Sequence, residues 1–328
     1  MKIDFLALCH SIKNNVKQTR AWLIANSNTE NIFNLLFTYS DLEHLMIDDD
    51  QAKGQEGKTC RPDSPKKSPA GKSHRPDSSM NSTESQVDPA VILYFRESCT
   101  EFINSFKLAE SSFYRYAFAA LRNALDAGIM SVASKEADDV MHSSGSPGPV
   151  LQQLQAREII GKLYKITNVK HFCKKSDIIE KCRKLHQELS ALSGGKDFAS
   201  GLVHNVPTLS AGFDEKVFIL WTVCLRKTIR MLFNLFILKY PVAILNTPLE
   251  KKISPGFRGG PFLNSEERES LIELLDGDDL DILMEISKKD PYALKQAAEV
   301  NSCPDIVEEE LSRQLKGLKE ELKKNSSG

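Results

Sequence analysis

The chain has 328 residues, of which 43 are Lys or Arg and 44 are Asp or Glu, giving a net charge of −1. Hydrophobic residues make up 41% of the chain. This composition is that of an ordinary globular protein, and it excludes a collagen, a disulfide scaffold and a wholly disordered chain. The near-zero charge excludes a protein whose whole surface binds anions, so any electrostatic specialisation must be local.

Several features predict a cytoplasmic protein without a membrane span. The seven cysteines are an odd number without regular spacing, which favours reduced thiols. The first residues, MKIDFLALCH, are too short and too interrupted for a signal peptide. The most membrane-like stretch, residues 217–238, carries Arg226, Lys227 and Arg230 at its centre, and central cations are costly in hydrocarbon. We therefore expect that stretch to be a buried core helix.

The first 90 residues divide into an ordered and a disordered part. Apolar residues recur at three- and four-residue spacings over residues 1–47, which predicts a pair of antiparallel helices joined near residues 27–29. Residues 48–90 contain no Ile, Leu, Phe, Trp or Tyr and are rich in Ser, Pro and Lys. Such a segment cannot bury enough apolar surface to fold, so we expect a disordered linker.

Residues 91–247 are predicted to form a helical bundle. Apolar stripes of helical period indicate helices at 91–108, 111–132, 151–167, 176–192 and 213–240. A Gly- and Pro-rich break lies at 143–150. Because no segment alternates with a period of two, the predicted fold class is all-α.

The C-terminal part is predicted to be a linker, 248–264, followed by an acidic helical region, 265–328. Helices are expected at 265–275 and 278–288, and residues 304–324 carry a leucine stripe that suits a coiled coil with a partner. Residues 91–250 contain 20 basic and 15 acidic residues, whereas residues 251–328 contain 12 and 17. The two regions could mask one another within the chain or meet across an oligomer.

Basic residues are concentrated between positions 157 and 184, where nine Lys and Arg face three acidic residues. A basic helix pair of this kind suits the phosphate backbone of RNA, although a solvated helix face has the same composition. Only two aromatic residues lie there, so base stacking is not expected. The candidate nucleic-acid-binding residues are Lys162, Lys165, Lys170, Lys174, Lys175, Lys181 and Lys184.

The densest group of metal-ligating residue types is His171, Cys173, Cys182 and His186. Cys182 and His186 are one helical turn apart and could share a zinc ion. Common zinc modules instead use two close Cys pairs, so ordinary core and surface positions are favoured. We therefore predict no bound metal, with these four residues as the only candidate ligands.

One group of residues could cleave a phosphodiester bond. Arg183 and His186 lie on one face of a predicted helix, and the loop that follows brings His204 back toward them. Histidine can act as general acid or base while arginine stabilises phosphoryl charge. The alternative is a helix-packing corner without catalytic function. Arg122 and Asp126, one turn apart on another helix, predict a structural ion pair.

Residues 91–246 contain three notable stretches, which are FYRYAFAALRNALDAG, the corner from LHQELSALSGG to LVHN, and LKYPVAIL. Together they resemble the HEPN-like helical domains of prokaryotic phage-defence and abortive-infection systems. The ribonucleases of that family carry an Arg, four to six residues and then a His, but here only two residues separate Arg183 from His186. The resemblance implies a helical bundle in a defence setting and leaves ribonuclease activity open.

The expected function is therefore a component of an antiviral defence system, acting on RNA or through a protein encoded nearby. The alternative is a non-catalytic helical interaction or scaffold protein. No cofactor is expected, and self-association is compatible with the opposed charges of the two regions.

Overall fold

The computed structural model describes residues 5–26, 28–43, 89–144, 156–194, 212–245, 265–275 and 277–302, together with residues 305 and 316. The described residues form helices and no strand, which confirms the predicted all-α class. The predicted linkers, 48–90 and 248–264, and the leucine-striped segment 304–324 lie outside these ranges, apart from residues 89, 90, 305 and 316. None of the helices in the described part of the chain is long and apolar enough to cross a membrane.

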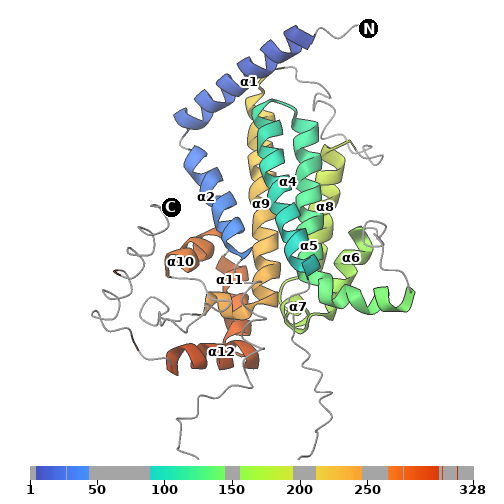
Figure 1. The fold of residues 1–328 in the computed structure, drawn as a ribbon, viewed down its shortest axis with the longest axis vertical. Helices are drawn as coiled ribbons and strands as arrows, with labels where there is room; N and C mark the ends of the chain where they lie inside the picture. The colour runs from blue at the N-terminus through green and yellow to red at the C-terminus, as the bar shows by residue number, and fades with distance from the viewer. Residues whose placement is uncertain are drawn as a thin grey trace, which may run out of the picture.

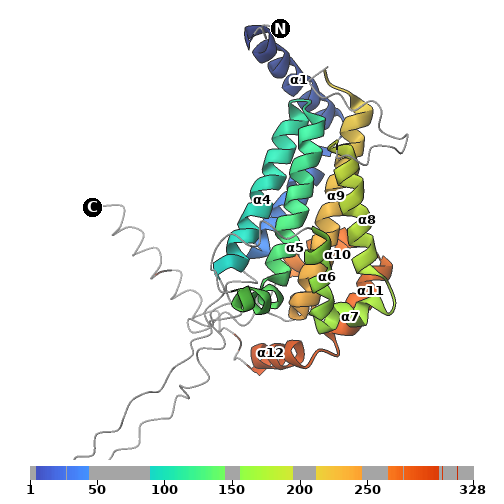
Figure 2. The ribbon, with the colours of Figure 1, turned by 90° about the vertical axis from the view of Figure 1, so that its right-hand side faces the viewer.

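Four long helices run lengthwise through the molecule (Figures 1 and 2). They are α4 (Pro89–Glu110), α5 (Tyr114–Ser144), α8 (Ile178–Leu192) and α9 (Glu215–Lys239). Helix α9 is the predicted core helix: most of it from Phe218 onward is buried, while Arg226 and Lys227 face outward. The cations at its centre therefore reach solvent from one exposed stripe.

Helices α5 and α9 approach each other closely at Gly128. A Cβ atom there would lie 2.6 Å from both terminal methyl groups of Leu232 and 3.1 Å from the Tyr39 hydroxyl. Alanines at positions 117, 120, 124 and 127 are also buried on α5. Small side chains along α5 thus let the long helices pack at short range.

The N-terminal helices do not form the expected antiparallel pair. Helix α1 (Phe5–Ala25) crosses one end of the bundle, whereas α2 (Asn28–Asp41) runs along α4 and α9 (Figures 1 and 2). Tyr39 anchors α2 in the core, because its ring contacts Phe95 and Phe102 and its hydroxyl lies 2.8 Å from Ser98 Oγ. Both helices therefore pack on the bundle, α1 on α4 and α2 on α4 and α9.

The predicted helix over 151–167 is wrong in extent. Helix α6 (Ala156–Lys162) passes into a 3₁₀ turn, η2 (Leu163–Lys165), and Ile166 is extended before α7 (Thr167–Cys173) begins. The short helix α7 had no prediction of its own. Ile166, Val169 and Phe172 are buried, so the break turns a second apolar stripe toward the core.

The C-terminal region contains α10 (Ser265–Leu274), α11 (Gly277–Ser287) and α12 (Pro291–Ser302), and α12 was not predicted. Asp290 caps α12 by accepting a hydrogen bond from the Ala293 amide at 2.8 Å, with Pro291 at the first helical position. Leu271, Leu275 and Leu283 belong to the same core as the long helices. A 3₁₀ turn, η3 (Pro241–Ile244), contacts α10, α11 and α12.

Candidate functional site

The structure pairs His186 with an acidic residue on another helix. His186 Nε2 on α8 lies 3.3 Å from Asp126 Oδ1 on α5, and the two side chains are 23% and 31% exposed. Asp126 is thus the partner of His186, where the sequence had suggested a pair with Arg122. A carboxylate that orients a partly exposed imidazole is an arrangement used for general acid–base chemistry.

The other two catalytic candidates are not assembled around this pair. Arg183 lies one turn before His186 and forms a 3.5 Å ion pair with Glu180 on its own helix. Its Nε atom is buried and has no hydrogen-bond partner. His204 lies outside the described residues. The described part of the candidate site is therefore His186 with Asp126, and Arg183 nearby on the same helix.

The four candidate metal ligands occupy different environments. His171 is exposed on α7, whereas Cys182 is buried on α8. Burial, followed by the nearby Asp126 carboxylate, raises the pKa of the Cys182 thiol to about 12, so this thiol keeps its proton. Burial also raises the pKa of Cys173. Among the described side chains, no three His, Cys, Asp or Glu are grouped so that they could hold a metal ion.

Helix α11 covers part of the predicted basic surface. Lys175 forms an ion pair with Glu285, and Lys181 forms one with Asp279. Lys162 is half-buried, while four of the candidate lysines are exposed, namely Lys165, Lys170, Lys174 and Lys184. The acidic region thus neutralises two of the seven candidate lysines within the same chain.

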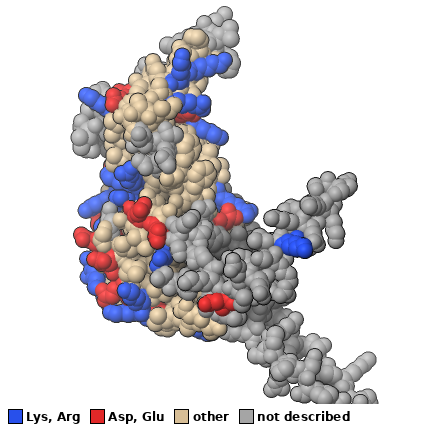
Figure 3. Space-filling model, turned by 90° about the vertical axis from the view of Figure 1, so that its left-hand side faces the viewer, with Lys and Arg blue, Asp and Glu red and all other residues tan. Residues whose placement is uncertain are grey.

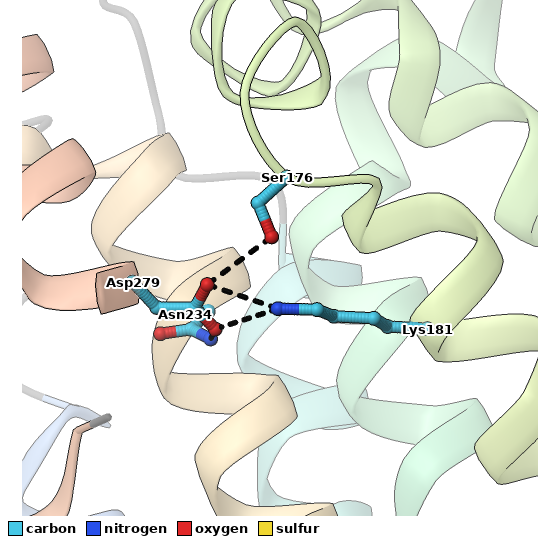
Figure 4. A network of polar contacts seen from close by, with 4 residues as sticks. All are labelled: Ser176, Lys181, Asn234 and Asp279. Atoms are coloured by element: carbon cyan, nitrogen blue, oxygen red, sulfur yellow. Dashed lines mark hydrogen bonds and ion pairs between the residues drawn. The ribbon is translucent and has the colours of Figure 1, made fainter. Parts of the chain in front are cut away.

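Asp279 is the centre of the contact between α11 and the bundle (Figure 4). Its carboxylate is buried and accepts hydrogen bonds from Ser176 Oγ at 3.2 Å, Lys181 Nζ at 3.0 and 3.2 Å, and Asn234 Nδ2 at 3.2 Å. These donors come from the α7–α8 turn, α8 and α9. This network could not be predicted from the sequence, because its members are far apart in the chain.

An open cavity of about 630 Å³ lies beside this network, between α7, the end of α9 and α11. His171, Lys174 and Lys175 of the predicted basic surface line its wall on α7. Ile282 and Ile286 line the opposite wall on α11. The cavity is thus built at the junction of the basic and acidic regions.

A second, smaller groove of about 290 Å³ lies between α2 and α4. It is lined almost wholly by apolar side chains, namely Phe33, Leu36, Phe37, Tyr39, Ser40, Cys99, Phe102, Ile103 and Phe106. Phe37 is 63% exposed and Ile103 is 48% exposed. Figure 3 shows the side of the molecule that carries α2, with uncharged residues in the middle and many Lys and Arg toward its edges. Helical periodicity predicted helices over the segments of α2 and α4 but not this exposed groove.

No protein-family model, no curated protein and no solved structure matches this chain.

Proposed function

We propose that this protein is a helical interaction module whose α2–α4 groove binds an amphipathic helix of another protein. The observation that carries the proposal is the apolar groove with Phe33, Phe37 and Ile103 at its surface. Binding an amphipathic helix in an apolar groove is a common recognition mode, in which apolar side chains one turn apart enter the groove.

Burial and charge support a protein partner. Covering an exposed phenylalanine releases about 1.5–3 kcal/mol per side chain, so the exposed rings favour a covered state. The rings of Phe33 and Phe106 lie 5.5 Å apart, so the two walls form one continuous apolar surface. Lys107 is exposed one turn after Ile103 on α4. We therefore expect the partner helix to carry an acidic residue beside its apolar stripe.

Site-specific crosslinking in the native host tests this function. The photo-reactive amino acid benzoylphenylalanine replaces Phe37 or, as a matched control, Ile24, which is 76% exposed on α1 outside the groove. A protein crosslinked at position 37 and not at 24 is then expressed, and its apolar helical segments are tested as peptides against the purified chain. We expect one peptide to bind and Ile103→Glu to weaken it about tenfold or more.

Three outcomes would contradict the proposal. Equal crosslinking at positions 24 and 37 would indicate nonspecific binding to exposed apolar residues. Crosslinks only to a second copy of this chain would replace the partner with self-association. Binding that is unchanged by Ile103→Glu would move the partner away from the groove.

A second candidate function is RNA cleavage at His186 and Asp126 in an antiviral defence setting. The specific observation in its favour is the 3.3 Å contact between the imidazole and the carboxylate. The resemblance to HEPN-like domains and the exposed lysines on α7 and α8 also support it. The observed spacing of Arg183 and His186 departs from the ribonuclease pattern of that family, so the interaction module ranks first.

Incubating the purified chain with total RNA, with and without divalent metal, tests this second function. We expect His186→Ala to abolish cleavage and cellular toxicity and Asp126→Asn to reduce cleavage about 10- to 100-fold, because the imidazole loses its orienting partner. Gln187→Ala, an exposed neighbour on α8, is the matched control. Cleavage that survives His186→Ala would remove this residue from the mechanism.

A further inference from the structure

The cavity between α7, α9 and α11 is separate from the α2–α4 groove and shares no residue with it. Its volume of about 630 Å³ lies within the range of about 300–1,000 Å³ that is typical of small-molecule sites. The cavity is open to solvent, and its walls come from helices far apart in sequence. It therefore has the size and the access that a ligand of intermediate size requires.

The walls of this cavity carry a positive excess. Two carboxylates, Glu285 and Asp290, face four lysines, which are Lys174, Lys175, Lys239 and Lys289. Both carboxylates are already engaged. Glu285 binds Lys175 and Lys289, and hydrogen bonds from these two ammonium groups lower the pKa of Glu285 to about 2. Asp290 accepts a hydrogen bond from Asn168 Nδ2 at 3.0 Å and caps α12. Lys174 is exposed and lies outside these two ion pairs, so its ammonium group can meet an anion.

The floor of the cavity is apolar. Ile166 and Leu238 are buried at its base, and Ile282 and Ile286 of α11 are half-buried along its side. Free phosphate alone would leave this surface in contact with water. A ligand that fits both features has an anionic group near the lysines and an apolar body against the isoleucines.

The geometry points to a binding site for a phosphate monoester with an apolar or planar body, about the size of a nucleoside monophosphate. Lysine ammonium groups act as point charges and are common phosphate ligands. Lys174 is exposed and supplies a charge that the Glu285 contacts do not use. The imidazole ring of His171 lines the same wall and offers a nitrogen that can donate a hydrogen bond.

The site depends on α11, which supplies one of its walls. Asp279 holds α11 against the bundle by three donors, so the cavity exists only when α11 is docked. A ligand that bridges α7 and α11 binds only the docked state and therefore stabilises it. Ligand binding and docking of the C-terminal helices are thus linked.

Calorimetric titration of the full chain with AMP, adenosine and inorganic phosphate tests the site. We expect saturable binding of AMP, with adenosine and phosphate each about tenfold weaker or more. Lys174→Gln removes one of the proposed phosphate contacts and should weaken AMP about fivefold to tenfold. Lys216→Gln, at an exposed lysine near the start of α9 and outside the cavity, should leave AMP affinity within about twofold. Asp279→Ala should abolish AMP binding because α11 loses its anchor.

Absence of AMP binding, or equal binding of adenosine, would overturn the phosphate site. Equal binding of inorganic phosphate would overturn the role of the apolar floor. If Lys174→Gln and Lys216→Gln weaken AMP binding equally, AMP responds to the overall positive charge of the protein and the cavity is not the site. Retention of AMP affinity in Asp279→Ala would contradict the dependence on α11.

Discussion

Lys181 Nζ on α8 lies 3.0 Å from the buried carboxylate of Asp279 on α11, across 98 positions of the chain. The lysine side chain is 48% exposed and the aspartate side chain 8% exposed, so the ion pair is only partly desolvated. Ser176 and Asn234 donate to the same carboxylate. The contact therefore joins the acidic region to three elements of the bundle at once.

Asp279→Ala should lower the free energy of unfolding by about 2–4 kcal/mol. The substitution removes the acceptor that three side chains share and leaves the buried Asn234 amide without it, while the half-exposed Lys181 recovers part of its hydration. Urea unfolding measures the loss. Asp281→Ala, at an exposed position on the same helix, should change stability by less than about 0.5 kcal/mol. Equal effects of the two substitutions would show that α11 is not held by Asp279.

The long helices were predictable from sequence because their apolar stripes repeat over many turns. The core stripe of α4, with Phe95 and Phe102, and the apolar run of α9 lie within the predicted segments. The short helices α7 and α12 were missed, since two or three turns give too few repeats. The Asp290–Pro291 cap of α12 was nevertheless a readable start signal.

The contacts of the candidate sites could not be predicted in the same way. Asp126 had an apparent partner one turn away, Arg122, yet tertiary packing brings His186 to it. The masking of Lys175 and Lys181 was one of two arrangements that the segment charges allowed. Periodicity tells which face of a helix is buried, but the choice of neighbouring helix depends on packing between distant segments.

Gly194→Ala should lower the free energy of unfolding by about 2–3 kcal/mol. Gly194 ends α8 with a φ of +87°, which other residues adopt only with strain. An added methyl group would also displace Arg115, whose guanidinium donates to the carbonyls of Ser193 at 2.9 Å and Gly194 at 3.3 Å. Thermal and urea unfolding both measure the effect.

Gly161→Ala is the matched control for that substitution. Gly161 is exposed in α6, and nothing lies within 4 Å of an added Cβ. Alanine should therefore stabilise the chain by up to about 1 kcal/mol, because it has the higher helix propensity. A loss of stability in Gly161→Ala would show that the space around Gly161 is occupied. No loss in Gly194→Ala would show that Gly194 does not have a positive φ.

The stability of the fold should fall as pH rises above about 8.5. Burial raises the pKa of three thiols, Cys99, Cys182 and Cys224, to about 12 each. An unfolded thiol has a pKa of about 8.5, so between these values the unfolded chain has released a proton that the folded chain retains. The free energy of unfolding should then decrease with pH, by up to about 1.4 kcal/mol per thiol and pH unit, and be constant with respect to these groups at lower pH.

Urea midpoints measured from pH 7.5 to 10 test this dependence on the thiols. The pH range ends at 10 because of Tyr39. Burial raises the pKa of Tyr39 well above 10, so its ionisation in the unfolded chain would add a similar slope at higher pH. Cys182→Ala removes one of the three ionising groups and should reduce the slope by about a third, whatever its effect on stability at neutral pH. Combining it with Cys99→Ala and Cys224→Ala should leave only the slope due to other groups. If the triple variant keeps the slope of the parent chain, the alkaline loss of stability arises elsewhere and the three thiols are accessible to water in the folded state.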